Sequence, residues 1–238
     1  MRRKIILLGA LVLLATMAVA RIKIIHSMHR LTAESKLVFV GRVDSISKSG
    51  ITTTLSYPPL RGATFEWLRV DVDVVEPIKG VTNRQIVHTA MLSLKDKGDA
   101  IMYSPPDMIG PVLGKMYLLF LVPGNGSNLF AGVTAPYDED QSIFILDRNS
   151  RQYAGYQEAR ESRDPYYENA GVIFSLVDEK GRLLENGVQK MRQTYAGEIK
   201  DNSSNLVMSL QWETETNSAG WMRDVPKGTA GIPEPKRK

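Results

Sequence analysis

The stretch LVFVGRVDSI, residues 37–46, decides how this chain is expected to fold. It opens with four consecutive apolar residues and then alternates from Gly41, with Val43 and Ile46 on the inward side. Alternation with a period of two predicts a β-strand that buries one face. A glycine inside a strand is typical of a bulge or a tight bend, as at the corner of a small barrel. We therefore predict a first strand that bends at Gly41.

Five further apolar stretches predict strands, and turn-forming or polar segments separate them. They span residues 65–75, 84–91, 115–122, 128–134 and 142–146. The fourth predicted strand, residues 115–122, is apolar on both faces and is expected to be central. Several strands with long irregular loops and a bent first strand favour a small Greek-key barrel. Closing such a barrel removes the exposed edges that invite aggregation.

The composition changes at Asp147, which ends the predicted barrel domain of residues 21–147. Residues 172–184 predict a short hairpin, residues 188–195 an amphipathic helix, and residues 206–212 a last strand. The fold class that we predict is mainly β, with an OB-like Greek-key barrel and a small α+β C-terminal extension. The extension would span residues 148–215 and precede a disordered tail, residues 216–238. One or two helical turns at residues 31–35 would lead into the first strand.

The first twenty residues have the layout of a secretory signal peptide. Three cations at positions 2–4 precede an apolar run, residues 5–19, and the segment ends in small residues just before Arg21. This layout predicts cleavage before Arg21 and a secreted or periplasmic protein. The alternative is an uncleaved membrane anchor, although a membrane span needs about 20 apolar residues. Contact with a membrane is expected only if the segment is retained.

Charge and cysteine content exclude several classes of function. The chain has 30 basic and 26 acidic residues, and removal of residues 1–20 takes away three cations, which leaves 27 against 26. A nearly neutral mature chain lacks the concentrated basic surface that nucleic acids require, so we predict no nucleic-acid partner. The absence of cysteine excludes disulfides, thiolate nucleophiles and cysteine-ligated metals.

Four segments in a fixed order carry a resemblance to a known family. They are SKLVFVGRV (35–43), RVDVDVVEPIKG (69–80), QIVHT (85–89) and VLGKMYLLFL (112–121). Together they resemble the OB-fold domain of tissue inhibitors of metalloproteinases and netrin-like modules, in the cysteine-poor form of secreted bacterial proteins. The resemblance covers residues 35–147 and implies a rigid barrel that presents loops to another protein. Animal inhibitors of this family chelate protease zinc through an N-terminal cysteine, and this chain has no cysteine to do so.

The loop Tyr57-Pro58-Pro59-Leu60-Arg61 is the predicted partner-binding element. Its prolines hold an extended backbone, so Tyr57 and Leu60 are exposed at a small cost in conformational entropy. The alternative is a Pro-Pro turn in which Tyr57 folds back on the barrel.

Two weaker patterns have both a functional and a structural interpretation. His26 and His29 are three residues apart, so on a helix they would share a face and, with a third ligand, bind zinc. The alternative is two surface histidines, and we predict no metal. Asp71 and Asp73 share one face of a strand, where a hydrolase with paired carboxylates would place them. Charges alternating along the wet face of an antiparallel strand are the alternative.

Signatures of catalysis are missing from the sequence. It contains no Gly-x-Ser-x-Gly elbow, no His-Glu-x-x-His pattern and no glycine-rich loop joining a strand to a helix. We therefore predict a protein that is not an enzyme and has no cofactor. The expected function is a binding, inhibitor-like module that contacts another extracellular or envelope protein through its barrel loops. The alternatives are a membrane-anchored structural accessory protein of the envelope and, less favoured, an envelope hydrolase.

Overall fold

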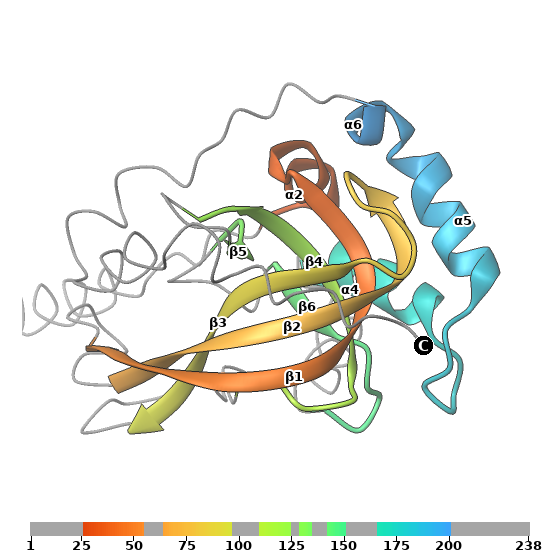
Figure 1. The fold of residues 1–238 in the computed structure, drawn as a ribbon. Coiled ribbons are helices and arrows are strands. Elements are labelled where there is room, and N and C mark those ends of the chain that lie inside the picture. Colours follow the sequence, from red (N-terminus) through yellow and green to blue (C-terminus); the bar gives the residue numbers. More distant parts are fainter. Residues whose placement is uncertain are drawn as a thin grey trace, which may run out of the picture.

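Among the residues that the structure describes, strands build most of the fold, and four short helices lie beside them (Figure 1). The computed structural model describes residues 26–54, 64–96, 110–124, 129–134, 142–150 and 166–200. The strands are β1 (Leu37–Thr54), β2 (Thr64–Lys79), β3 (Ile86–Asp96), β4 (Met116–Pro123), β5 (Phe130–Gly132) and β6 (Ile143–Ile145). The helices are α2 (Met28–Glu34), α4 (Tyr166–Leu176), α5 (Glu185–Thr194) and α6 (Ala196–Lys200).

Five of the strands close into a mixed barrel. Their order is β1-β2-β3-β5-β4, and pairing of β4 with β1 closes the ring. The pairing of β3 with β5 is parallel, whereas β1–β2, β2–β3, β4–β5 and β1–β4 are antiparallel. β6 adds to β4 beside β5. The prediction of a mainly β, OB-like Greek-key barrel is confirmed.

The predicted bend in the first strand is also present. The register between β1 and β2 shifts between Val40 and Gly41, which is a bulge. A Cβ atom at Gly41 would overlap the side chain of Val72 on β2. Glycine therefore leaves room for the side chains of Val72 and Phe39 at a position where β1 pairs with both β2 and β4.

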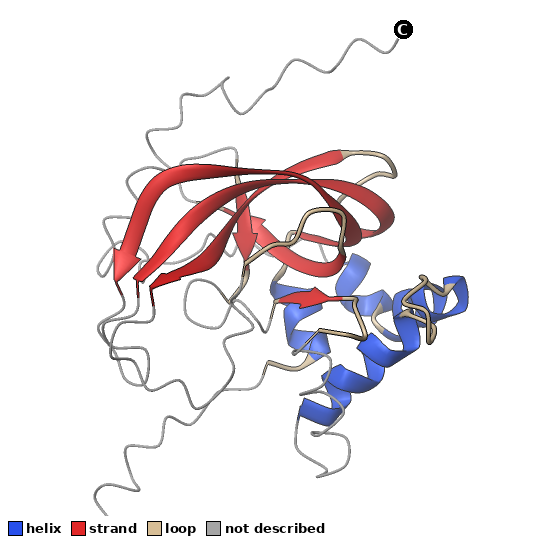
Figure 2. Cartoon of the chain, turned by 90° about the horizontal axis from the view of Figure 1, so that it is seen from below, coloured by secondary structure: helices blue, strands red, loops and turns tan. Residues whose placement is uncertain are grey.

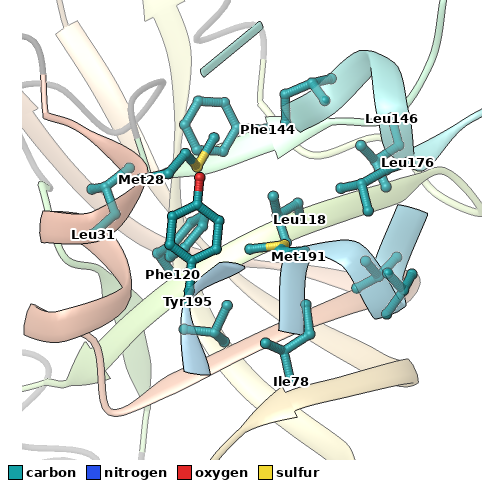
Figure 3. Close-up of a cluster of buried hydrophobic side chains, with 14 of the residues drawn as sticks. Met28, Leu31, Ile78, Leu118, Phe120, Phe144, Leu146, Leu176, Met191 and Tyr195 are labelled. Atoms are coloured by element: carbon teal, nitrogen blue, oxygen red, sulfur yellow. The ribbon is translucent and has the colours of Figure 1, made fainter. Parts of the chain in front are cut away.

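Two apolar clusters lie on opposite faces of the barrel wall. The barrel interior is filled by side chains that include Phe39, Val70, Val72, Met91, Tyr117 and Leu119. A second cluster lies between the wall and the helices and includes Met28, Leu31, Val38, Leu118, Phe120, Phe144, Met191 and Tyr195 (Figure 3). Alternate residues of β4 therefore enter different cores, which explains why that strand is apolar on both faces.

The C-terminal extension packs directly on the barrel. Figure 2 shows the helices gathered on one side of the strands, and α4 and α5 contribute Ile173, Val188 and Met191 to the core they share with β1 and β4. Arg192 of α5 adds an ion pair with Glu76, 3.0 Å between Nη2 and Oε2. The extension is thus one layer of the same packed body.

One predicted element of the extension is wrong. The first strand of the hairpin predicted at residues 172–184 is absent, because the chain is helical to Leu176 and only an isolated bridge joins Val177 to Leu183. Ala170, Ile173 and Leu176 are buried at helical spacing against the second core, so packing selects the helix. The helix predicted at residues 188–195 is confirmed as α5. The predicted elements at residues 1–20, 206–212 and 216–238 lie outside the described residues.

Candidate functional site

A cluster of polar side chains lies on the outer face of β1, β2 and β3, because the alternate residues Val70, Val72 and Val87 point into the barrel. The strand register places Ser45, Asp71 and His88 side by side in one row across the three strands. The Ser45 hydroxyl donates to Asp71 Oδ2 over 3.0 Å, and His88 Nδ1 lies 2.7 Å from Asp71 Oδ1. Only 8% of the surface of Asp71 is exposed. Both oxygens of this nearly buried carboxylate are therefore used.

The hydrogen bonds define the orientation of the imidazole. A carboxylate only accepts, so His88 Nδ1 carries the proton that is donated to Asp71. In the neutral ring the acceptor is then Nε2, and the His88 side chain is partly exposed. The Arg69 guanidinium lies 3.9 Å from the same carboxylate and balances its charge. Neighbouring strands thus hold His88 in one tautomer and one orientation.

The next row on the same face is more exposed. Arg42, Asp73 and Ile86 are register partners across β1, β2 and β3. All three are exposed, and 43% of the surface of Ile86 is accessible. Within the described part of the chain, neither Arg42 nor Asp73 makes an ion pair. This face therefore combines a fixed polar centre with an exposed apolar side chain and two exposed charges.

The arrangement is not that of a nucleophilic triad. In such a triad the histidine lies between the nucleophile and the carboxylate and removes the proton of the nucleophile. Here Asp71 lies between Ser45 and His88. The Ser45 hydroxyl therefore donates to the Asp71 carboxylate and does not contact the imidazole that would remove its proton in a triad. Asp71 and Asp73 do share one strand face, as expected, but Asp71 is occupied by its hydrogen bonds and only Asp73 is exposed.

A second feature is an exposed apolar turn at residues 110–114, just before β4. Val112 and Leu113 are exposed, and Leu113 reaches 63%. The backbone is held firmly, because Gly114 N donates to Val43 O over 2.9 Å and Val112 N donates to the hydroxyl of Tyr117 over 3.0 Å. Burial of Tyr117 raises the pKa of its hydroxyl to about 12. The turn therefore presents apolar side chains on a well-anchored loop.

The structure does not describe the predicted partner-binding loop. That loop consists of Tyr57, Pro58, Pro59, Leu60 and Arg61, which all lie outside the described residues.

The predicted histidine pair does not share a helical face. His26 precedes Ser27, the N-cap of α2, so only His29 lies in the helix. His29 Nδ1 lies 2.6 Å from Glu198 Oε1, and its ring packs edge-on against Tyr195. The bond to His29 is the main reason that the pKa of Glu198 is lowered. Across the described ranges, no group of three histidine, aspartate or glutamate side chains could hold a metal ion.

Neither the hydrogen bond of Ser45 to Asp71 nor the exposed apolar turn at residues 110–114 was predicted from the sequence. Ser45 reaches Asp71 because the register shifts between Val43 and Ser45, and a bulge of this kind leaves no pattern in the sequence. The turn did carry a signal, since two apolar residues stand between Pro111 and Gly114. Turn residues that flank an apolar pair are compatible with an exposed contact loop as well as with a buried connection.

Comparison of the chain with protein-family models, curated proteins and solved structures finds no match. Among the described helices, none combines the length and the apolar character needed to cross a membrane.

Proposed function

We propose that this protein is a secreted or periplasmic binding module, inhibitor-like and without enzymatic activity, that contacts another extracellular or envelope protein through the loops of its barrel. The signal-peptide layout of residues 1–20 supports the location. The resemblance of residues 35–147 to netrin-like OB-fold domains supports a role in binding. In OB folds the barrel serves as a rigid support for binding loops and a binding face.

The exposed turn at residues 110–114 is the observation that carries this proposal. An exposed leucine is ordinary on a mobile loop, but here hydrogen bonds to Val43 and Tyr117 fix the backbone that presents Leu113. A preformed loop loses little conformational entropy on binding, so its apolar contact area contributes almost fully to affinity. The turn therefore has the properties of a contact loop at one end of the barrel.

Site-specific photo-crosslinking tests the proposal. Leu113 is replaced by benzoylphenylalanine in the full chain, which is produced in its own cells and irradiated there. Leu184 serves as the matched control, because it is also an exposed leucine, 39% accessible, but lies at the start of α5 in the helical layer. We expect a discrete adduct with one other protein from position 113 and none of that mass from position 184.

Competition makes the test specific. Excess purified wild-type protein should suppress the adduct, whereas the Leu113→Ser variant should suppress it far less, because truncating an anchor side chain costs more than about 1 kcal/mol of binding. The absence of an adduct at position 113, or the same adducts from both positions, would refute the proposed function.

A further inference from the structure

The exposed turn lies directly beside β1, the first strand of the polar face. The backbone of Gly114 bonds to Val43 on β1, Arg42 of β1 is the register partner of Asp73 on β2, and Asp73 is the partner of Ile86 on β3. The order across the surface is therefore turn, β1, β2, β3. Adjacent strands lie about 4.8 Å apart, so the turn and Ile86 are separated by roughly 15 Å measured along the curved wall of the barrel. A patch of this width fits well within one side of a standard protein interface.

The chemistry of the patch is that of a protein interface. Ile86 supplies exposed apolar area in the row of Arg42 and Asp73, which carry opposite charges and make no ion pair within the described residues. Interfaces commonly surround apolar contacts with a polar rim, and charges on the rim select the partner. A polyanion would meet the carboxylate of Asp73 beside the cation, so the balanced charges favour a protein over a nucleic acid.

His88 supplies a preorganised hydrogen-bond acceptor in the neighbouring row. The Nδ1–H group of His88 donates to Asp71, and Asp71 is itself fixed by the Ser45 hydroxyl. The imidazole thus has no orientational freedom to lose when a donor reaches Nε2, and binding to such a fixed group is favoured for that reason.

We propose that the outer face of β1–β3 around Ile86 and His88 forms, together with the Leu113 turn, a single contact surface for one protein partner. The partner's segment packs an apolar side chain on Ile86, donates a hydrogen bond to His88 Nε2, and presents an acidic group to Arg42 and a basic group to Asp73. This inference rests on the proposed binding function and identifies the surface and the partner chemistry that serve it.

Crosslinking from the strand face tests the surface. Benzoylphenylalanine replaces Ile86 in the full chain, in parallel with positions 113 and 184. We expect an adduct of the same mass from positions 86 and 113 and its absence from position 184. An adduct at 113 with none of that mass at 86 would overturn this inference and leave the proposed function standing. No adduct at either position would overturn both, and a covalent dimer of this chain at position 86 would overturn the inference because the partner would be a second copy.

Two isosteric variants test the role of His88 in recognition. His88→Asn retains an amide N–H near the position of Nδ1, which can still donate to Asp71, but lacks the outer acceptor. His88→Gln places an amide oxygen near the position of Nε2. Introduced into the chain that crosslinks from position 113, Asn should lower the adduct yield about tenfold, as expected for the loss of one hydrogen bond to a fixed acceptor, and Gln should restore most of it.

A purely structural role for His88 predicts a different order. Gln would then perform worse than Asn, because it loses the bond to Asp71, and the unfolding midpoint would fall together with the adduct yield. That result, or an unchanged yield in His88→Asn, would refute the role of Nε2 in partner recognition.

Discussion

At the scale of single residues, Tyr117 shows how burial and one hydrogen bond link stability to pH. Its ring lies in the barrel interior, and its hydroxyl accepts from Val112 N at the base of the exposed turn. Burial, and to a smaller degree the charge of Asp147, raises the pKa of Tyr117 from the ordinary tyrosine value of 10.0 to about 12. The folded protein therefore holds this proton more tightly than the unfolded chain does.

The raised pKa predicts a loss of stability in alkali. Below pH 10 the tyrosine is protonated in both states, so its contribution is fully present. As pH rises from 10 to about 12, the unfolded chain releases the proton first, which favours unfolding. The Tyr117→Phe variant lacks the hydrogen bond from Val112 N, so its free energy of unfolding at pH 8 should be about 1 kcal/mol lower than that of the wild type. Between pH 10 and pH 12, however, its free energy of unfolding should decline less steeply. Urea midpoints of both proteins across this range check the prediction, and parallel curves would contradict it.

Gly41 is a residue whose missing side chain allows the barrel to close. A Cβ at this position would overlap Val72 and come within 2.8 Å of the Phe39 ring. We expect Gly41→Ala to lower the free energy of unfolding by about 1–3 kcal/mol, because overpacked cores relax poorly. Chemical denaturation measures this, with Gly197→Ala as the control, since no atom lies within 4 Å of a Cβ there. Equal midpoints for the Gly41 variant and the wild type would refute the close-approach argument.

At the scale of elements, the contact of α4 with α5 depends on Gly187. A Cβ at Gly187 would overlap the backbone carbonyl of Ser175 on α4, and a backbone atom cannot move aside as a side chain can. Gly171, in contrast, lies on the exposed side of α4 and a Cβ there would meet no atom within 4 Å. The close contact of α4 with α5 therefore requires a glycine at position 187, whereas no neighbouring atom requires one at position 171.

The two glycines predict effects of opposite sign. Gly187→Ala should destabilise the protein by about 1–3 kcal/mol, because the helices must separate to admit the methyl group. Gly171→Ala should stabilise it by about 0.5–1 kcal/mol, because alanine loses less backbone entropy in a helix than glycine. Thermal or urea unfolding of the two single variants checks the pair. A gain in stability in both would show that α4 and α5 are not in close contact at Gly187.

At the scale of the whole molecule, the helical layer and the barrel share one core. Met28 of α2, Leu118 of β4 and Met191 of α5 meet in the same cluster (Figure 3). Lys79, almost fully buried at the end of β2, donates to the carbonyl of Thr32 over 2.9 Å and so caps the end of α2. These contacts connect residues at both ends of the described chain to the same wall of the barrel.

The shared core predicts that the barrel is not stable without its extension. A chain that starts at Arg21 and ends at Ser150 would expose the outer apolar face of β4 and β1, and exposed patches of this kind cause aggregation. We expect this truncated protein to aggregate or to lack a cooperative unfolding transition, whereas the chain from Arg21 to Lys238 should unfold in a single step. Size-exclusion chromatography and calorimetry distinguish the two outcomes, and a monomeric truncated barrel with a sharp transition would contradict the prediction.

The sequence by itself determined the barrel, because the information for its strands is local. The alternation in residues 37–46, the bend at Gly41 and the doubly apolar β4 all follow from neighbouring residues and the geometry of a strand. The amphipathic helix α5 was predictable for the same reason.

Only the tertiary structure decided the helix at residues 172–176 and the polar row on the outer face of the strands. Residues 172–176 form a helix because the second core accepts Ile173 and Leu176 at helical spacing, and a short apolar run does not distinguish helix from strand. The Ser45–Asp71–His88 row joins residues that lie 26 and 17 positions apart, and it exists only because a bulge and the strand register bring them together. A one-residue change of register would turn each of these side chains to the other face, which is why local sequence leaves them undetermined.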